Sequence, residues 1–135
     1  MPSPIRLDHN VQRVDGLPVL SVSGEIDIYT APLFKQAVVS LVSEGNNDVI
    51  IDLSGVTFMD SSGFGTLLGA TKRLRPTGGG LHLAAPNTTI QRMLRLTRLD
   101  SIMKIYEDVP SAVSAVHAKS GGSAAATAEA GRQAA

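Results

Sequence analysis

The hydrophobic and polar positions of this chain predict strands first and helices afterwards. Apolar residues are separated by polar ones from Ile5 to Val14, a pattern typical of a half-buried strand. The Asp15-Gly16 pair that follows is a turn signal, and the apolar positions of residues 17–23 predict the second strand of a hairpin. Gly24 is expected to end that strand.

A helix is expected next. Thr30 is a candidate N-cap, and Pro32 falls in the first helical turn, where its missing N–H costs nothing. Apolar residues then recur at helical spacing as far as Gly45. Residues 49–53 form a nearly continuous apolar run, as expected of a short strand buried on both faces, and a loop is expected after it.

The remaining pattern alternates helices with short strands. Asn87 is expected to cap the third helix, in which Ile90, Met93, Leu94 and Leu96 should face the core. The predicted elements are a helix at 61–75 ended by Pro76 and Gly78-Gly79-Gly80, a strand at 81–85, the helix that follows Asn87, a strand at 102–106 and a helix at 109–118.

The expected order is β-β-α-β-α-β-α-β-α, which indicates an α/β fold. Strands joined through helices require right-handed crossovers and parallel pairing, while the opening hairpin adds one antiparallel pair. We therefore expect a mixed β-sheet with helices mainly on one face, formed by a single domain at 1–118. Residues 119–135 are rich in Gly, Ser and Ala and hold no large apolar side chain, so they are expected to form a flexible tail.

Charge and composition exclude several classes of partner. Lys and Arg number 12, as do Asp and Glu, so the formal net charge is zero and no field draws the chain to nucleic acid or to an anionic membrane. The chain holds no cysteine and no apolar run of the ~20 residues that span a bilayer. The first ten residues lack the pattern of a secretory signal, and a cytoplasmic location is expected.

The residues that carry enzyme chemistry do not form a recognisable constellation. His9, His82 and His117 fall in three different predicted elements without metal-ligand spacing, and no calcium-loop spacing is present, so no metal is expected. Ser61 and Ser62 lack the Gly-x-Ser-x-Gly pattern of a hydrolase, and the glycines that follow them match no phosphate-binding loop. We expect neither a cofactor nor catalysis, which leaves a nucleotide-binding protein or small enzyme as a minor alternative.

The segment from Val56 to Gly65 is unusual. It places two apolar residues, Phe58 and Met59, beside an acid and two hydroxyl groups where a helix begins, and we expect both apolar side chains to be exposed. A purely structural interpretation is available, because Asp60 is a good N-cap and serine satisfies free N–H groups in a first helical turn.

The same residues carry a family resemblance. Gly24-Glu25-Ile26-Asp27, the apolar run at 49–53 and the segment Asp60-Ser61-Ser62-Gly63-Phe64-Gly65 together resemble a STAS domain, and more narrowly the anti-sigma factor antagonists. The resemblance covers residues 5–118, and the run Gly78-Gly79-Gly80 before a strand fits it as well. Phe64 stands where the family commonly has Leu.

The resemblance implies a switch and its partners. Ser61 would be phosphorylated by an anti-sigma factor with serine kinase activity, and a serine phosphatase would reverse the modification. Unphosphorylated protein would bind the anti-sigma factor and release a sigma factor. The implied binding surface consists of Asp27, Met59, Asp60, Ser61, Ser62 and Gly63, although Asp27 has an equally good interpretation as a turn residue.

A second function remains open within the same family. STAS domains also occur as subunits of membrane transport or lipid-trafficking complexes, which often lack a phosphorylatable residue at this position. The presence of Asp60-Ser61 favours the phosphorylation switch.

Overall fold

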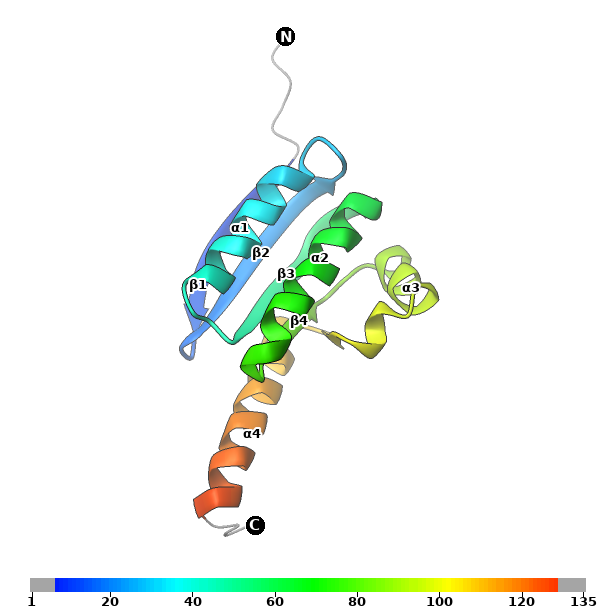
Figure 1. Cartoon of the computed structure of the whole chain (residues 1–135). Coiled ribbons are helices and arrows are strands. Elements are labelled where there is room, and N and C mark those ends of the chain that lie inside the picture. Colours follow the sequence, from blue (N-terminus) through cyan, green and yellow to red (C-terminus); the bar gives the residue numbers. More distant parts are fainter. Residues whose placement is uncertain (1–6, 129–135) are drawn as a thin grey trace.

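The computed structural model describes residues 7–128 and confirms the expected order of elements (Figure 1). The elements are β1 (Leu7–Val14), β2 (Leu17–Ile26), α1 (Ala31–Ser43), β3 (Asp48–Met59), α2 (Ser61–Leu74), a 3₁₀ turn (Arg75–Thr77), β4 (Gly80–Ala84), α3 (Thr88–Leu96), a second 3₁₀ turn (Leu99–Ser101), β5 (Lys104–Tyr106) and α4 (Val109–Ala128).

The strands form one mixed sheet in the sequential order β1-β2-β3-β4-β5. β1 pairs with β2 antiparallel, and every later neighbour is parallel. Asp15 and Gly16 adopt φ angles of 51° and 84° in the hairpin turn, as the turn signal predicts. Because each right-handed crossover adds its strand in the same direction, α1, α2 and α3 pack on one face of the sheet.

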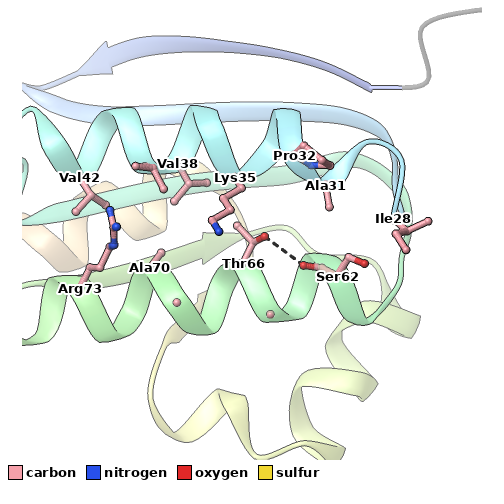
Figure 2. A pocket seen from close by; sticks show the side chains of 13 residues that line it. Ile28, Ala31, Pro32, Lys35, Val38, Val42, Ser62, Thr66, Ala70 and Arg73 are labelled. Carbon is pink, nitrogen blue, oxygen red and sulfur yellow. Dashed lines mark hydrogen bonds between the residues drawn. The ribbon is translucent and has the colours of Figure 1, made fainter.

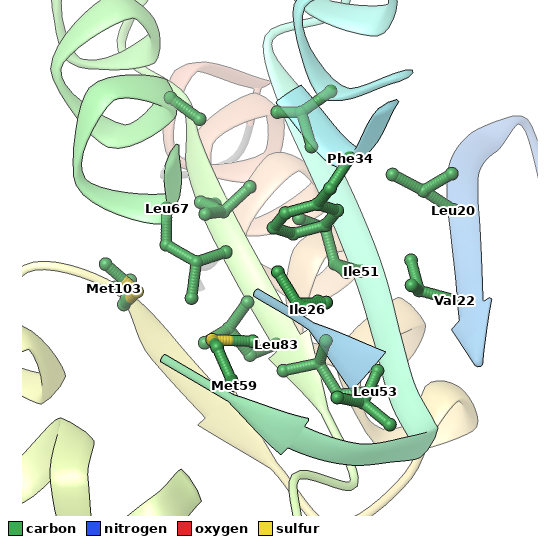
Figure 3. Packing of buried hydrophobic residues seen from close by; sticks show 14 of the residues in the cluster. Leu20, Val22, Ile26, Phe34, Ile51, Leu53, Met59, Leu67, Leu83 and Met103 are labelled. Atoms are coloured by element: carbon green, nitrogen blue, oxygen red, sulfur yellow. The ribbon is translucent and has the colours of Figure 1, made fainter. Parts of the chain in front are cut away.

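The main core lies between the sheet and these three helices. Alternate strand residues such as Leu20, Ile51 and Leu83 point toward Phe34 of α1 and Leu67 of α2 (Figure 3). α4 covers the opposite face, where Ala112 and Val113 pack against the sheet residues Val19, Ile50 and Ala84. The helices are thus mainly on one face, as expected, and the last helix closes the other.

Two strands are longer than the sequence pattern predicts. β2 does not end at Gly24 but passes through it at a φ of 109° and continues to Ile26. β3 runs to Met59, so the loop expected after residue 53 is instead strand. The cause is pairing: Glu25 lies opposite Phe58 and Ile26 opposite Met59, after register shifts that break the regular alternation of apolar residues.

The two C-terminal helices also differ from expectation. α4 continues to Ala128, ten residues beyond the expected end at 118, although residues 120–128 are only Ser, Gly, Ala and Thr. The rest of the tail, residues 129–135, lies outside the described residues. In α3, Ile90 and Leu94 are buried, but Met93 and Leu96 are 38% and 70% exposed, since this short helix has one neighbouring layer to pack against.

A polar cluster lies beneath α4. The imidazole of His82, 4% exposed, is 2.9 Å through Nε2 from Asp48 Oδ1 and 3.1 Å through Nδ1 from the Tyr106 hydroxyl. A carboxylate only accepts, so Nε2 carries the proton and the neutral ring accepts at Nδ1. Lys119 of α4 donates to the same Asp48 oxygen at 3.3 Å. Burial lowers the pKa of His82 below 6.5 and raises that of Tyr106.

Candidate functional site

Ser61 is the first residue of α2, and its side chain is exposed to solvent. Only Asp60 separates the end of β3 from the start of α2. The hydroxyl is therefore presented at the positive end of a 14-residue helix. A hydroxyl in this position is open to a modifying enzyme and to a protein partner.

Asp60 determines how α2 begins. Its Oδ1 accepts a hydrogen bond from the Ser62 backbone N–H at 2.8 Å, and its own N–H donates to the carbonyl of Ile26 at 3.0 Å. The first bond caps the helix, as predicted, and the second ties the end of β3 to the end of β2. Asp60 is half-buried, so this carboxylate serves the fold directly.

Met59 and Gly63 lie beneath the serines rather than beside them. The expectation that Met59 is exposed is wrong: the side chain is 7% exposed and belongs to the main core (Figure 3). Gly63 is buried as well, and a Cβ at this position would clash with the Met59 and Ile26 side chains. The residues are consecutive with the surface serines, but strand alternation turns Met59 inward while Phe58 faces out.

Asp27 shapes the loop between β2 and α1. Its Oδ1 accepts from the backbone N–H groups of Tyr29 at 2.9 Å and Thr30 at 3.0 Å, and its backbone oxygen accepts from Ala31 at 2.7 Å. Thr30 occupies the N-cap position as predicted, but its hydroxyl turns back to donate to the Glu25 carbonyl at 2.7 Å and does not cap the helix. Asp27 thus stabilises the turn, as one of its two interpretations predicted. Its predicted contact with a partner stays a prediction.

The sheet brings the two acidic loops together. Because β2 and β3 are parallel neighbours, their carboxyl ends lie at the same edge, where the pair Ile26 and Met59 is followed by Asp27 and Asp60. The residues expected to form the site, which are Asp27, Asp60, Ser61 and Ser62 near the surface and Met59 and Gly63 below it, are therefore in one region of the molecule. This edge of a parallel sheet is where α/β folds commonly carry binding sites.

Exposed apolar side chains adjoin this edge, and the sequence pattern identifies only one of them. Phe58 is 49% exposed, Ile28 is 67% exposed and Tyr29 is 82% exposed. Ile28 lies near Ser62, at the end of the groove between α1 and α2 (Figure 2). The overlooked signal is the Ile28-Tyr29 pair itself, which precedes the helix start at Thr30 and fits neither the strand nor the helix period.

Two further observations concern metals and membranes. Among residues 7–128, no group of three or more His, Cys, Asp or Glu side chains gathers in a way that could hold a metal ion. Over the same residues, no helix has the length and apolar character needed to cross a membrane.

Comparison with known proteins places this geometry in a family. The family model of the STAS domain matches residues 8–112. The anti-sigma-B factor antagonist of Staphylococcus epidermidis is 33% identical over 88 residues, which cover 65% of this chain and 82% of that protein. The crystal structure of an anti-sigma factor antagonist from Mycobacterium paratuberculosis superimposes with a TM-score of 0.79 at 33% identity, covering 87% of this chain and 99% of the other.

A more distant structure shares the fold alone. The phosphorylated form of SpoIIAA, a Bacillus cell fate determinant, has a TM-score of 0.65 at 22% identity and covers 81% of this chain and 99% of that one. The region that matches the family model, residues 8–112, contains nearly all of the five-stranded sheet, the helices α1, α2 and α3, and both acidic loops described above. The chain belongs to the STAS domain family, and its relatives include anti-sigma factor antagonists.

Proposed function

We propose that this protein is an anti-sigma factor antagonist controlled by phosphorylation of Ser61. The unphosphorylated protein binds an anti-sigma factor that is also a serine kinase, and this binding releases a sigma factor for transcription. Phosphorylation of Ser61 abolishes the binding, and a serine phosphatase restores it. The observation that carries the proposal is an exposed serine at the start of α2, beside the capping Asp60, in a chain whose relatives are antagonists.

The position of Ser61 allows a phosphate without loss of the fold. A phosphoserine adds about −1.5 to −2 charge at neutral pH. At the first position of a helix this charge meets free backbone N–H groups and the positive end of the helix dipole. Ser61 is exposed, so the phosphate also remains in water. We expect phosphorylation to leave the stability of the domain nearly unchanged.

The same charge disrupts a docked partner. Asp60 lies next to Ser61 and Asp27 lies at the same edge of the sheet, so the phosphate adds to an acidic surface. A partner packed against this edge must desolvate the phosphate or meet it with charge of the same sign, which costs several kcal/mol. Each ~1.4 kcal/mol is a tenfold change in affinity, so binding falls by orders of magnitude.

The remaining features fit a binding module that acts in the cytoplasm. The surface around Ser61 combines carboxylates and hydroxyls with exposed apolar side chains, which suits recognition of a protein. In this proposal Met59 and Gly63 support the surface from below, while Asp27, Asp60, Ser61 and Ser62 form it. The protein is a substrate of the kinase and has no catalytic residue of its own.

The decisive experiment is peptide mass spectrometry of the protein purified from its native cells in several growth conditions. We expect a phosphate on Ser61 whose occupancy changes with condition. The Ser61→Ala variant should carry none and should remain bound to the anti-sigma factor, whereas Ser62→Ala should still be phosphorylated on Ser61. A phosphate on Ser62 instead, or unchanged phosphorylation of the Ser61→Ala variant, contradicts the assignment.

A second variant tests the electrostatic part of the proposal. Ser61→Asp supplies about one charge and fewer acceptor oxygens than a phosphate, so it should weaken partner binding only in part. Binding of the anti-sigma factor by calorimetry is the measurement, with Ser61→Asn as the uncharged control of similar size. Full affinity in Ser61→Asp would exclude charge as the reason for release.

A further inference from the structure

A groove lies between α1 and α2, on the face of these helices that begins beside Ile28 and Ser62 (Figure 2). Its volume is about 630 Å³, within the range of about 300 to 1,000 Å³ that small-molecule sites occupy. Val38, Val39 and Val42 of α1 line one wall. The opposite wall, on α2, includes Ala70 and two glycines, so the groove is mostly apolar.

The charged residues of this groove are both basic. Lys35 of α1 and Arg73 of α2 line it, and its lining includes no carboxylate. Lys35 extends from α1 toward Thr66, and the guanidinium of Arg73 reaches across toward Val42 (Figure 2). Within the described part of the chain, neither side chain forms an ion pair or a side-chain hydrogen bond. Two cations beside an apolar wall create a preference for an anion.

The glycines keep the groove open without serving the core. A Cβ at Gly65 or Gly69 would have no neighbouring atom within 4 Å, and both lie in the regular helix. Glycine in a helix interior costs about 0.8 to 1 kcal/mol relative to alanine. Packing of the domain therefore does not require these glycines, and a larger side chain at either position would project into the groove.

We propose that this groove binds a small amphipathic carboxylate, a medium-chain fatty-acid anion. The alkyl chain lies along the valines of α1, and Arg73, whose guanidinium reaches toward Val42, holds the carboxylate. Lys35 lies two helical turns before Val42 and adds to the positive potential of the groove. The planar guanidinium suits a carboxylate because it donates two parallel hydrogen bonds. A nucleotide fits less well, since the lining holds no aromatic ring for a base and no phosphate-binding loop. This site does not depend on the phosphorylation of Ser61.

The test is a calorimetric titration of the whole protein with decanoate below its micelle concentration. We expect saturable binding at one site, weaker binding of the neutral methyl ester and none of decyltrimethylammonium, which has the same chain and a positive head. In ¹H–¹⁵N spectra, the decanoate-dependent shifts should be confined to α1 and α2. Absence of saturable binding, or equal binding of the cationic amphiphile, overturns the proposal.

Variants separate this site from general attraction of an anion. Arg73→Gln should weaken decanoate binding about tenfold, the equivalent of ~1.4 kcal/mol. Arg92→Gln removes the same charge from the exposed side of α3, which does not line the groove, and should leave binding unchanged. Gly69→Leu should abolish binding while the thermal midpoint stays the same or rises. Equal losses in Arg73→Gln and Arg92→Gln, or full binding by Gly69→Leu, contradict the site.

Discussion

Neighbouring residues at the start of α2 differ sharply in their exposure to solvent. Ser61 is exposed and presents its hydroxyl, whereas Met59 and Gly63 are buried beneath it. Asp60 connects the two groups, since its side chain caps the helix and its N–H bonds to β2. A short segment therefore combines an exposed hydroxyl with buried residues that support it.

Gly63 offers a direct test of that support. The Gly63→Ala variant should lose about 1 to 3 kcal/mol of unfolding free energy, because the added methyl group overpacks the Met59 and Ile26 side chains. Gly65→Ala, two residues away in open space, should instead gain up to about 1 kcal/mol from helix propensity. Urea denaturation of both variants is the measurement. Equal stability of the two would show that α2 is not held closely against the sheet.

Tyr29 is the exposed aromatic residue best placed to anchor a partner. Its ring is 82% exposed and follows the Asp27 turn at the edge of the sheet that carries Ser61. Truncation of a hot-spot residue, a class enriched in tyrosine, costs about 2 kcal/mol or more. If Tyr29 anchors the proposed partner, Tyr29→Ala should weaken anti-sigma factor binding at least tenfold. Leu96→Ala on α3 is the matched control, since Leu96 is 70% exposed but lies on another helix. A loss with Leu96→Ala and none with Tyr29→Ala would place the interface elsewhere.

At the scale of elements, each helix is fixed by contacts at its start or along one face. Asn87 Oδ1 accepts from the Ile90 N–H at 2.8 Å and caps α3 as predicted. Asp108 does the same for α4, and its hydrogen bonds with Ser111 lower the pKa of the carboxyl. α4 is further held by its buried apolar residues and by the polar cluster of His82, Asp48 and Lys119.

This cluster makes the stability of the domain depend on pH. The folded-state pKa of His82 lies below 6.5, because burial disfavours the imidazolium more than Asp48 favours it. The unfolded chain therefore binds a proton more readily, so the stability is complete above pH 6.5 and falls as the pH drops below it. Lys104 and Lys119 act in the same direction.

Thermal unfolding between pH 8 and pH 5 checks this expectation. The midpoint should fall below pH 6.5 in the wild type. His82→Gln keeps one donor and one acceptor without titrating, so its midpoint should change less over the same range. His9→Gln is the control, because His9 is exposed on β1. An identical pH profile in the wild type and His82→Gln would remove His82 as the cause.

At the scale of the whole molecule, connectivity decides which face each helix covers. α1, α2 and α3 each connect two neighbouring parallel strands. Because the strands are added in sequential order and each crossover is right-handed, all three helices lie on the same face of the sheet. α4 follows β5 and does not connect two strands of this sheet, so the crossover rule does not hold it to the first face, and it covers the second. Ser61 and the groove both belong to the crossover helices, which pack on the face of the sheet opposite α4.

Truncation tests how much of α4 the domain needs. Its buried residues Ala112, Val113 and Val116 precede Lys119. The free energy of unfolding of a chain that ends after Lys119 should therefore lie within about 0.5 kcal/mol of that of the full protein. A chain that ends after Asp108 should lose several kcal/mol, since burial of each valine contributes about 1.5 to 3 kcal/mol and Ile50 becomes exposed. A large loss from the first truncation would extend the domain beyond residue 119.

The sequence by itself determined the order of elements, the mixed sheet, the caps at Asp60 and Asn87 and the family. These features depend on local properties of the chain: the spacing of its apolar residues, turn residues such as Asp15-Gly16, and short motifs. Nearest-neighbour preferences are sufficient for such features, because the residues that decide them are close together in the chain.

Only the tertiary structure decided where the strands end and which side chains of the site are exposed. β3 extends to Met59 because β2 pairs with it, and that pairing turns Met59 inward and leaves Phe58 in solvent. The groove exists because α1 and α2 lie side by side, although residues 44–60, including the whole of β3, separate the two helices in the chain. No local pattern encodes that neighbourhood. Burial depends on contacts between distant segments, and those contacts are set by the packing of the whole sheet.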